Sequence, residues 1–293
     1  MTDEYTAICV LAYRISFRSP ENFLAYQDFD NTPNNKDLRK SWAPHLKHFV
    51  DGVDPKWKIN KGKGIIGAIN YLSSQGMNAF SFLTFNVEGD DTNVFPYISE
   101  TNRYRFDVSK LAQWEIVFEH ADKMGMMLHF KTFEQENDQL LDNGDLGPQR
   151  KLYYRELVAR FSHHLALVWN LGEEISNTID QIKMISNYVK SVDPYDHIIV
   201  ASTTPSGTYY SGLSGTKSFS GLSIQALPSN VYTNTLTWLQ VSENANHKWI
   251  VSNDEQGIAR SGVVPDSVDP THDAIRQDSL WGNLMVRFCF AEI

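Results

Sequence analysis

The feature that most constrains this fold is a regular alternation of short apolar runs with longer helical patterns. Apolar runs that suit buried strands cover 23–26, 77–84, 126–130, 165–170, 197–201, 219–225 and 249–252. Helical spacing of apolar residues follows over 65–72, 107–124, 148–161, 179–192 and 233–241, and a last helix is expected from Asp269 to Leu284. Gly76 and Gly125 end helices because glycine adopts positive φ at little cost. Strands that lack strict polar alternation and are separated by helices predict a parallel sheet covered on both faces.

These strands, with 286–291 as an eighth, favour an α/β fold, a single-domain (β/α)₈ TIM barrel. The chain of 293 residues is long enough for such a barrel, which typically needs about 250. An open doubly wound sheet is the alternative, and the absence of a GxGxxG motif after the first strand weakens it. We expect residues 1–19 to be an N-terminal extension and 20–293 to be the barrel. The eighth strand should be truncated or atypical, because it falls on the last residues.

The composition disfavours several classes of partner. The chain has 26 Lys and Arg against 35 Asp and Glu, a net charge of −9, and no basic run. Duplex nucleic acid and anionic membranes are therefore poor partners. No apolar run approaches the roughly 20 residues of a membrane span, and the first residues carry acids where a signal peptide needs bases. Cys9 and Cys289 make no disulfide framework, and whether they pair stays open, as does the oligomeric state.

Polar and acidic residues gather directly after the predicted strands. Since the strands of a barrel present their C-terminal ends on one face, these residues should share one rim. The rim includes Asn86, Lys131, Glu134, Glu136, Asn170, Glu173, Glu174, Gln225 and Glu255. Carboxylates that converge on a cleft fit either metal binding or glycoside cleavage. His129 lies within a strand and His163–His164 precede one, so neither is placed as a metal ligand, and we predict sugar chemistry without metal or cofactor.

Two of these strand ends resemble the catalytic motifs of clan A glycoside hydrolases. Residues 168–174, Val-Trp-Asn-Leu-Gly-Glu-Glu, resemble the strand-four motif Trp-Asp-Leu-Gly-Asn-Glu, whose last residue is the general acid/base. Residues 249–255, Trp-Ile-Val-Ser-Asn-Asp-Glu, resemble the strand-seven segment that ends in the nucleophile. The resemblance implies these two roles for Glu174 and Glu255. Glu173 stands where the clan has an Asn that binds the sugar 2-hydroxyl, which we interpret as a substrate clue.

Longer stretches resemble a narrower group of bacterial glycoside-hydrolase-like proteins of the collagen-binding-domain or domain-of-unknown-function type. The matching stretches include PENFLAYQDFDNTPN, KGKGIIGAINYLSSQGMNAFSFLTFN, LHFKTFEQENDQLLDNG and LWGNLM. This resemblance implies that the full-length protein is secreted or periplasmic, although the present chain shows no export signal. Because its two ends depart from the group's pattern, we expect this chain to be a fragment or an altered-frame version of such a protein.

The leading hypothesis is a retaining glycoside hydrolase that cleaves a poly- or oligosaccharide with two glutamates. Substrate contacts are expected from the other rim residues and from two aromatic residues, Trp169 beside the acid/base and Trp281 before the last strand, although core packing suits both tryptophans equally well. A non-catalytic carbohydrate- or collagen/matrix-binding barrel is the alternative. A metal-dependent barrel enzyme that uses the acidic rim is the third possibility.

Overall fold

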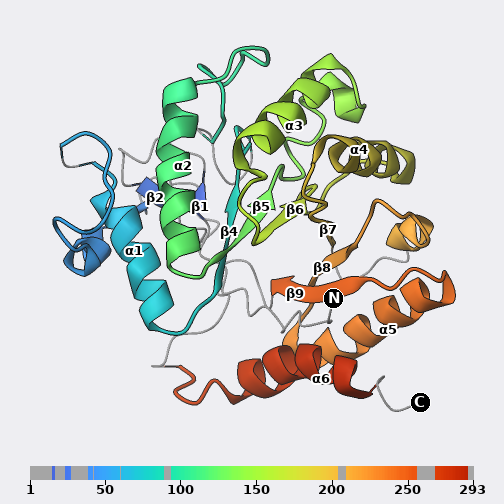
Figure 1. Cartoon of the computed structure of the whole chain (residues 1–293). Helices are drawn as coiled ribbons and strands as arrows, with labels where there is room; N and C mark the ends of the chain where they lie inside the picture. Colours follow the sequence, from blue (N-terminus) through green and yellow to red (C-terminus); the bar gives the residue numbers. More distant parts are fainter. Residues whose placement is uncertain are drawn as a thin grey trace.

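One curved sheet of seven parallel strands organises the chain (Figure 1). The computed structural model describes residues 15–16, 24–27, 39–41, 43–59, 61–88, 94–203, 209–255 and 268–289. In spatial order the strands are β1 (Ile15–Ser16), β4 (Ala79–Leu83), β5 (Met127–Lys131), β6 (Leu167–Asn170), β7 (Ile198–Thr203), β8 (Gly221–Gln225) and β9 (Ile250–Glu255). Neighbours from β4 to β9 follow one another along the chain, as in a βα-repeat fold.

Helices lie between or after these strands and cover the outer side of the sheet (Figure 1). They are α1 (Lys63–Ser74), α2 (Val108–Lys123), α3 (Pro148–Phe161), α4 (Ile179–Val192), α5 (Val231–Asn244) and α6 (Gly282–Cys289). Shorter helical segments are η3 (Ala43–His48), η4 (Asp142–Gly144), η5 (Tyr209–Leu213), η6 (Pro228–Asn230) and the π-helical η7 (Ile275–Trp281). Among the described residues, none of these helices is long and apolar enough to cross a membrane.

Two predicted strands differ from the structure. The run at 23–26 does form a strand, β2 (Leu24–Gln27), but β2 pairs antiparallel with β3 (Arg39–Ser41) in a separate sheet, and β1 takes the place beside β4. The prediction of an eighth strand at 286–291 is wrong over its described part, because α6 continues to Cys289. Residues 290–291 and Cys9 lie outside the described residues. The described strands therefore form an open seven-stranded sheet rather than a complete eight-stranded barrel.

Packing against α5 explains why the segment after residue 281 is helical. Val286 is fully buried, and the Asn283 side chain donates hydrogen bonds to Thr235 Oγ1 at 2.9 Å and to the Val251 carbonyl at 3.4 Å. These contacts join α6 to α5 and to β9. A helix satisfies its own backbone groups, so this segment needs no neighbouring strand to pair with.

The two faces of the sheet differ in polarity. On the outer face, Phe82 packs on Trp114 and Phe118 of α2, and Phe130 packs on Phe161 of α3. Paired residues of neighbouring parallel strands point to the same face, and successive residues of one strand point to opposite faces. The polar residues next to these aromatic residues in the chain therefore share the inner face. That face carries the buried polar residues Ser81, His129, Lys131, Asn170, Ser202, Ser223 and Asp254. The apolar core therefore lies between the sheet and the helices, and the buried polar and charged side chains lie on the concave face of the sheet.

Candidate active site at the C-terminal edge of the sheet

A buried charge cluster joins the ends of β5, β6 and β9. It consists of His129, Lys131, Glu173 and Asp254, whose side chains are all at most 4% exposed. Lys131 Nζ lies 2.7 Å from Asp254 Oδ2 and 3.4 Å from Glu173 Oε2, and His129 Nδ1 lies 3.6 Å from Asp254 Oδ1. One ammonium group thus stands between two carboxylates in a region shielded from water, where charges interact strongly.

The surroundings set the charge of two members of this cluster. Burial by itself raises the pKa of Asp254, but the positive charge of Lys131, the nearby His129 ring and a hydrogen bond from Lys131 outweigh it and hold that pKa below its ordinary value. Burial lowers the pKa of His129, despite the nearby Asp254 carboxylate. Asn170 Nδ2 donates to His129 Nε2 at 3.0 Å, which leaves the proton of a neutral ring on Nδ1, towards Asp254.

A β-bulge at the end of β9 separates Asp254 from Glu255. Ile224 pairs with Asn253 and Gln225 pairs with Glu255, so Asp254 is the extra residue of the bulge. A bulge redirects the side chains around it: Asp254 is 3% exposed, whereas Glu255 is only partly buried. The Gln225 amide donates to Glu255 Oε2 at 2.9 Å. A donor of this kind favours the ionised carboxylate.

The turn after β6 sends two adjacent glutamates in different directions. Glu173 is 2% exposed and its N–H donates to the Phe133 carbonyl at 2.8 Å, whereas Glu174 is exposed. Glu174 has φ of 51°, the left-handed region, which costs a non-glycine residue roughly 1–2 kcal/mol. Gly172 has φ of 155°, and a Cβ there would lie 2.0 Å from Ile175 Cγ2. The turn therefore requires the glycine and holds Glu174 in a strained conformation.

Three further predicted rim residues lie along the same edge. The Asn86 amide donates to Glu134 Oε2, and the backbones of Glu134 and Glu173 pair as a short bridge. Asn137 fixes the loop after β4 by accepting from the backbone of Val87 at 2.8 Å and donating to Asn86 Oδ1 at 3.0 Å. Glu136 is exposed on the loop that follows β5. The structure thus brings Asn86 and Glu134 next to Glu173.

Trp169 is not part of this edge. Its side chain is fully buried on the outer face, 4.9 Å from the Phe130 ring, and its indole N–H donates to Asp193 at the end of α4 at 3.1 Å. The strand alternation explains the correction, because Asn170 points to the inner face and its neighbour must point away. The predicted role of Trp169 in sugar stacking is therefore replaced by a role in the core.

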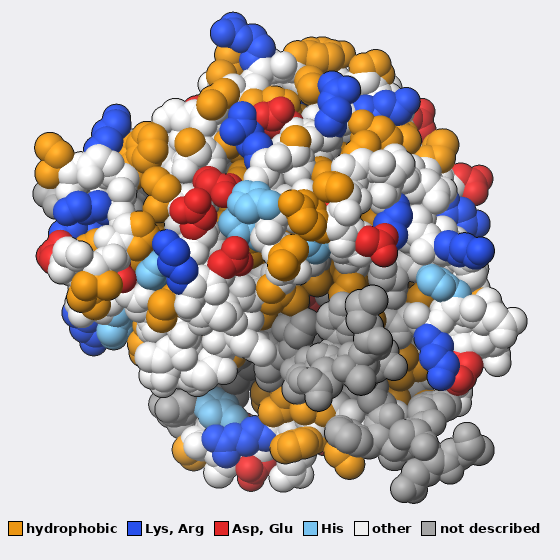
Figure 2. Space-filling model, viewed as in Figure 1, with side chains coloured by type: hydrophobic (Ala, Val, Ile, Leu, Met, Phe, Trp, Pro, Cys, Tyr) orange, Lys and Arg blue, Asp and Glu red, His pale blue; other side chains and the backbone are white. Residues whose placement is uncertain are grey.

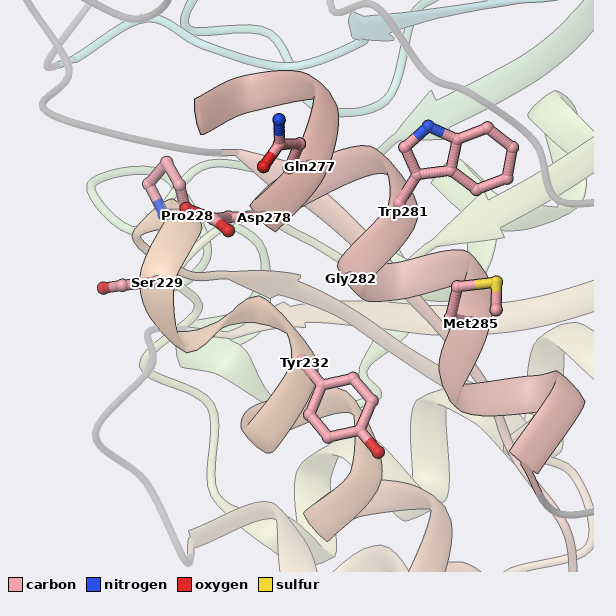
Figure 3. A pocket seen from close by; sticks show the side chains of 8 residues that line it. All are labelled: Pro228, Ser229, Tyr232, Gln277, Asp278, Trp281, Gly282 and Met285. Atoms are coloured by element: carbon pink, nitrogen blue, oxygen red, sulfur yellow. The ribbon is translucent and has the colours of Figure 1, made fainter. Parts of the chain in front are cut away.

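Trp281 lies on a helix rather than before a strand. It ends η7, is 53% exposed, and borders a pocket of about 300 Å³ (Figure 3). The pocket is lined by Pro228, Ser229, Tyr232, Gln277, Asp278, Trp281, Gly282 and Met285. Its wall at Pro228 begins just after Gln225, at the same end of β8 as the site. An exposed indole and a phenol ring beside amide and carboxyl groups are features of sugar-binding surfaces.

Sequence reasoning did not assign a role to His129 or Asp254. A signal for His129 was present, since His129 and Lys131 occupy alternate positions of an otherwise apolar strand and must share a face. The same alternation places Asp254 on the face of Ser252, which pairs with Ser223 of the inner face, and the bulge instead changes the direction of Glu255.

Solved structures with a similar fold are glycoside hydrolases. A glycoside hydrolase family 5 protein from Bacteroides vulgatus ATCC 8482 matches with a TM-score of 0.57 and 14% identity, over 78% of this chain and 53% of that one. An exo-beta-1,4-mannosidase from Opitutaceae bacterium strain TAV5 matches with a TM-score of 0.52 and 11% identity, over 76% of this chain and 46% of that one.

Neither a scan against protein-family models nor a search of curated proteins finds a match. The chain spans about half the length of the solved structures that it matches. At these identities the likeness is one of fold. The chain therefore has an α/β fold similar to that of TIM-barrel glycoside hydrolases, and the collagen-binding type stays a prediction.

Proposed function

We propose that this chain is a retaining glycoside-hydrolase-like protein that cleaves O-glycosidic bonds of a poly- or oligosaccharide. The observation that carries the proposal is the pair of glutamates at the C-terminal ends of β6 and β9, on a sheet similar to that of glycoside hydrolases. Glu174 is exposed, as a residue that reaches a substrate must be, and Glu255 accepts a hydrogen bond that favours its charged form.

In this mechanism Glu255 is the nucleophile and Glu174 is the general acid/base. The Glu255 carboxylate attacks the anomeric carbon while Glu174 gives its proton to the glycosidic oxygen, so the bond to the leaving sugar breaks as the glycosyl-enzyme bond forms. Glu174 then takes a proton from water, which attacks the same carbon and releases Glu255. Such a double displacement requires the two carboxyl groups to stand about 5–5.5 Å apart.

The buried charge cluster is proposed to position these glutamates. Lys131 holds Glu173 and Asp254, and each is the chain neighbour of a catalytic candidate. Cross-linking the ends of β5, β6 and β9 in this way limits their relative movement, which a preorganised site needs. Glu134, Asn86 and the Trp281 pocket are proposed to contact further sugar units.

The test begins by screening the chain against marine, plant and host glycans for release of reducing ends. On a substrate so found, Glu255→Ala should lower turnover by at least about 10³-fold, the scale of losing a nucleophile. Azide should restore turnover and give a product of inverted anomeric configuration, because it replaces the missing carboxylate. Glu174→Ala should lower turnover less for substrates with good leaving groups than for substrates with poor ones, because a good leaving group needs less help from a general acid.

Glu243→Gln is the matched control, since Glu243 lies on α5 and pairs with Lys248 at 3.0 Å. It should leave turnover unchanged. Full activity of Glu255→Ala would contradict the assignment. Binding to a glycan or to collagen without any release of reducing ends would instead support the non-catalytic binding module.

A further inference from the structure

Two histidines and a glutamate converge in the outer helical layer, away from the site described above. Glu115 lies on α2, and His163 and His164 follow the end of α3. Glu115 Oε1 lies 2.9 Å from His163 Nε2 and 3.5 Å from His164 Nε2, and the three groups lie within 4.8 Å of one another. Figure 2 shows acidic and histidine side chains gathered on the face over α2 and α3.

His164 is held in the manner of a metal ligand. Its side chain is fully buried, and Nδ1 lies 2.6 Å from Asp122 Oδ2. Nε2 points towards Glu115 Oε1, 3.5 Å away. The Asp122 carboxylate at Nδ1 fixes the orientation of the ring, so Nε2 is aimed at the cluster. This is the usual outer-shell arrangement of a histidine that binds a metal.

A cation can take the place of a proton in this cluster. Without a metal, the carboxylates of Asp122 and Glu115 face the two ring nitrogens of His164 and favour its protonated form. A divalent ion that displaces the Nε2 proton is attracted to both His164 Nε2 and the Glu115 carboxylate, and the charges of Glu115 and Asp122 balance its own. In tetrahedral zinc with bonds of about 2.0–2.1 Å, ligand atoms stand roughly 3.3 Å apart, close to the two distances from Glu115 Oε1.

We propose that Glu115, His163 and His164 form a binding site for Zn²⁺, with Asp122 orienting His164. Two imidazoles and a carboxylate are ligands that suit zinc, whereas Mg²⁺ and Ca²⁺ prefer oxygen. The ion joins α2 to the end of α3, so its effect is on the stability of the outer layer. The site is independent of the proposed glycosidase activity.

The test measures metal binding by the whole chain after treatment with a chelator. Titration with ZnCl₂ should show one tight site per chain, and zinc should raise the melting temperature. Co²⁺ in its place should give visible absorption bands of a tetrahedral site. Glu115→Gln and His163→Gln should each weaken zinc binding at least tenfold, and Asp122→Asn should weaken it about 10–100-fold.

Glu119→Gln is the matched control, because Glu119 is an exposed acid one turn further along α2. It should bind zinc as the parent does. Glu115 and His163 are partly exposed, so their variants should fold even if a His164 variant does not. Zinc binding no tighter than millimolar, or binding that Glu115→Gln leaves unchanged, would overturn the proposal.

Discussion

Lys131 places one positive charge within 3.4 Å of two buried carboxylates of the charge cluster, those of Glu173 and Asp254. Removing one partner of a buried ion pair lowers the free energy of unfolding by more than the intact pair contributes to it, because the remaining charge is left away from water without compensation. Asp254, which lies 2.7 Å from Lys131 in the bulge of β9, would be left in this state. The residue thus links the stability of the fold to the geometry of the site.

Lys131→Met should therefore lower the free energy of unfolding by about 3–5 kcal/mol. Lys248→Met is the control, because Lys248 is 77% exposed and pairs with Glu243 at 3.0 Å, and such surface pairs contribute about 0–1 kcal/mol. Urea denaturation of the two variants measures both values. Equal losses would show that Lys131 is no more important than a surface lysine.

Lys110 makes stability depend on pH. Its side chain is largely buried and donates to the Phe95 carbonyl at 2.7 Å, and burial lowers its pKa to about 8 against the attraction of Asp107. An unfolded lysine has a pKa near 10.4. Between these values the unfolded chain binds more protons than the folded one, so this group makes the free energy of unfolding rise with pH.

Lys110→Met should remove this rise. From pH 7.5 to 9.5 the parent should gain on the order of 1–2 kcal/mol relative to the variant, as measured by denaturation at each pH. Lys248→Met, which removes an exposed lysine, should follow the parent. A pH dependence that Lys110→Met does not alter would contradict the assignment.

At the scale of elements, two helical glycines differ in what surrounds them. Gly67 in α1 lies against η3, where an added Cβ would stand 2.1 Å from the His45 carbonyl oxygen. The nearest atoms to a Cβ on Gly282 in α6 are at 3.6 Å, an ordinary contact. The close approach of η3 to α1 therefore requires glycine at 67, whereas α6 accepts a side chain at 282.

Gly67→Ala should destabilise the fold by about 1–3 kcal/mol, because a backbone segment must move. Gly282→Ala should be neutral or stabilising by up to about 1 kcal/mol, since alanine favours a helix. Thermal and urea denaturation of both variants compare them directly. Equal effects would mean that η3 does not pack on α1 as closely as described.

Elements with strong periodicity were predictable, and those fixed by a neighbour were not. The predicted strands at 77–84 and 165–170 contain β4 and β6, and that at 126–130 overlaps all of β5 except Lys131, because a short buried apolar run between two helices usually forms a strand. The apolar run at 286–291 suits a strand or a helix equally, and contact with α5 selects the helix over its described part. The strand at 23–26 exists, but its partner is β3 instead of β4.

At the scale of the whole molecule, the fold separates two kinds of chemistry. The buried charge cluster and the two glutamates lie at the C-terminal ends of the strands, and the proposed zinc site lies outside, between α2 and the segment after α3. In βα-repeat folds the active site lies at the C-terminal ends of the strands, and features elsewhere contribute to stability. The two proposals can thus be tested without interference.

The sequence by itself determined the βα order, the parallel strands and the gathering of acids after them, because these follow from local periodicity and chain direction. The tertiary structure decided which way each of those residues points. Asp254 and Glu255, or Glu173 and Glu174, are neighbours in the chain, yet a bulge and a left-handed turn leave one member of each pair buried and the other more accessible. The meeting of Glu115 with His163 and His164 also depends on helix packing, which brings together residues that no local pattern connects.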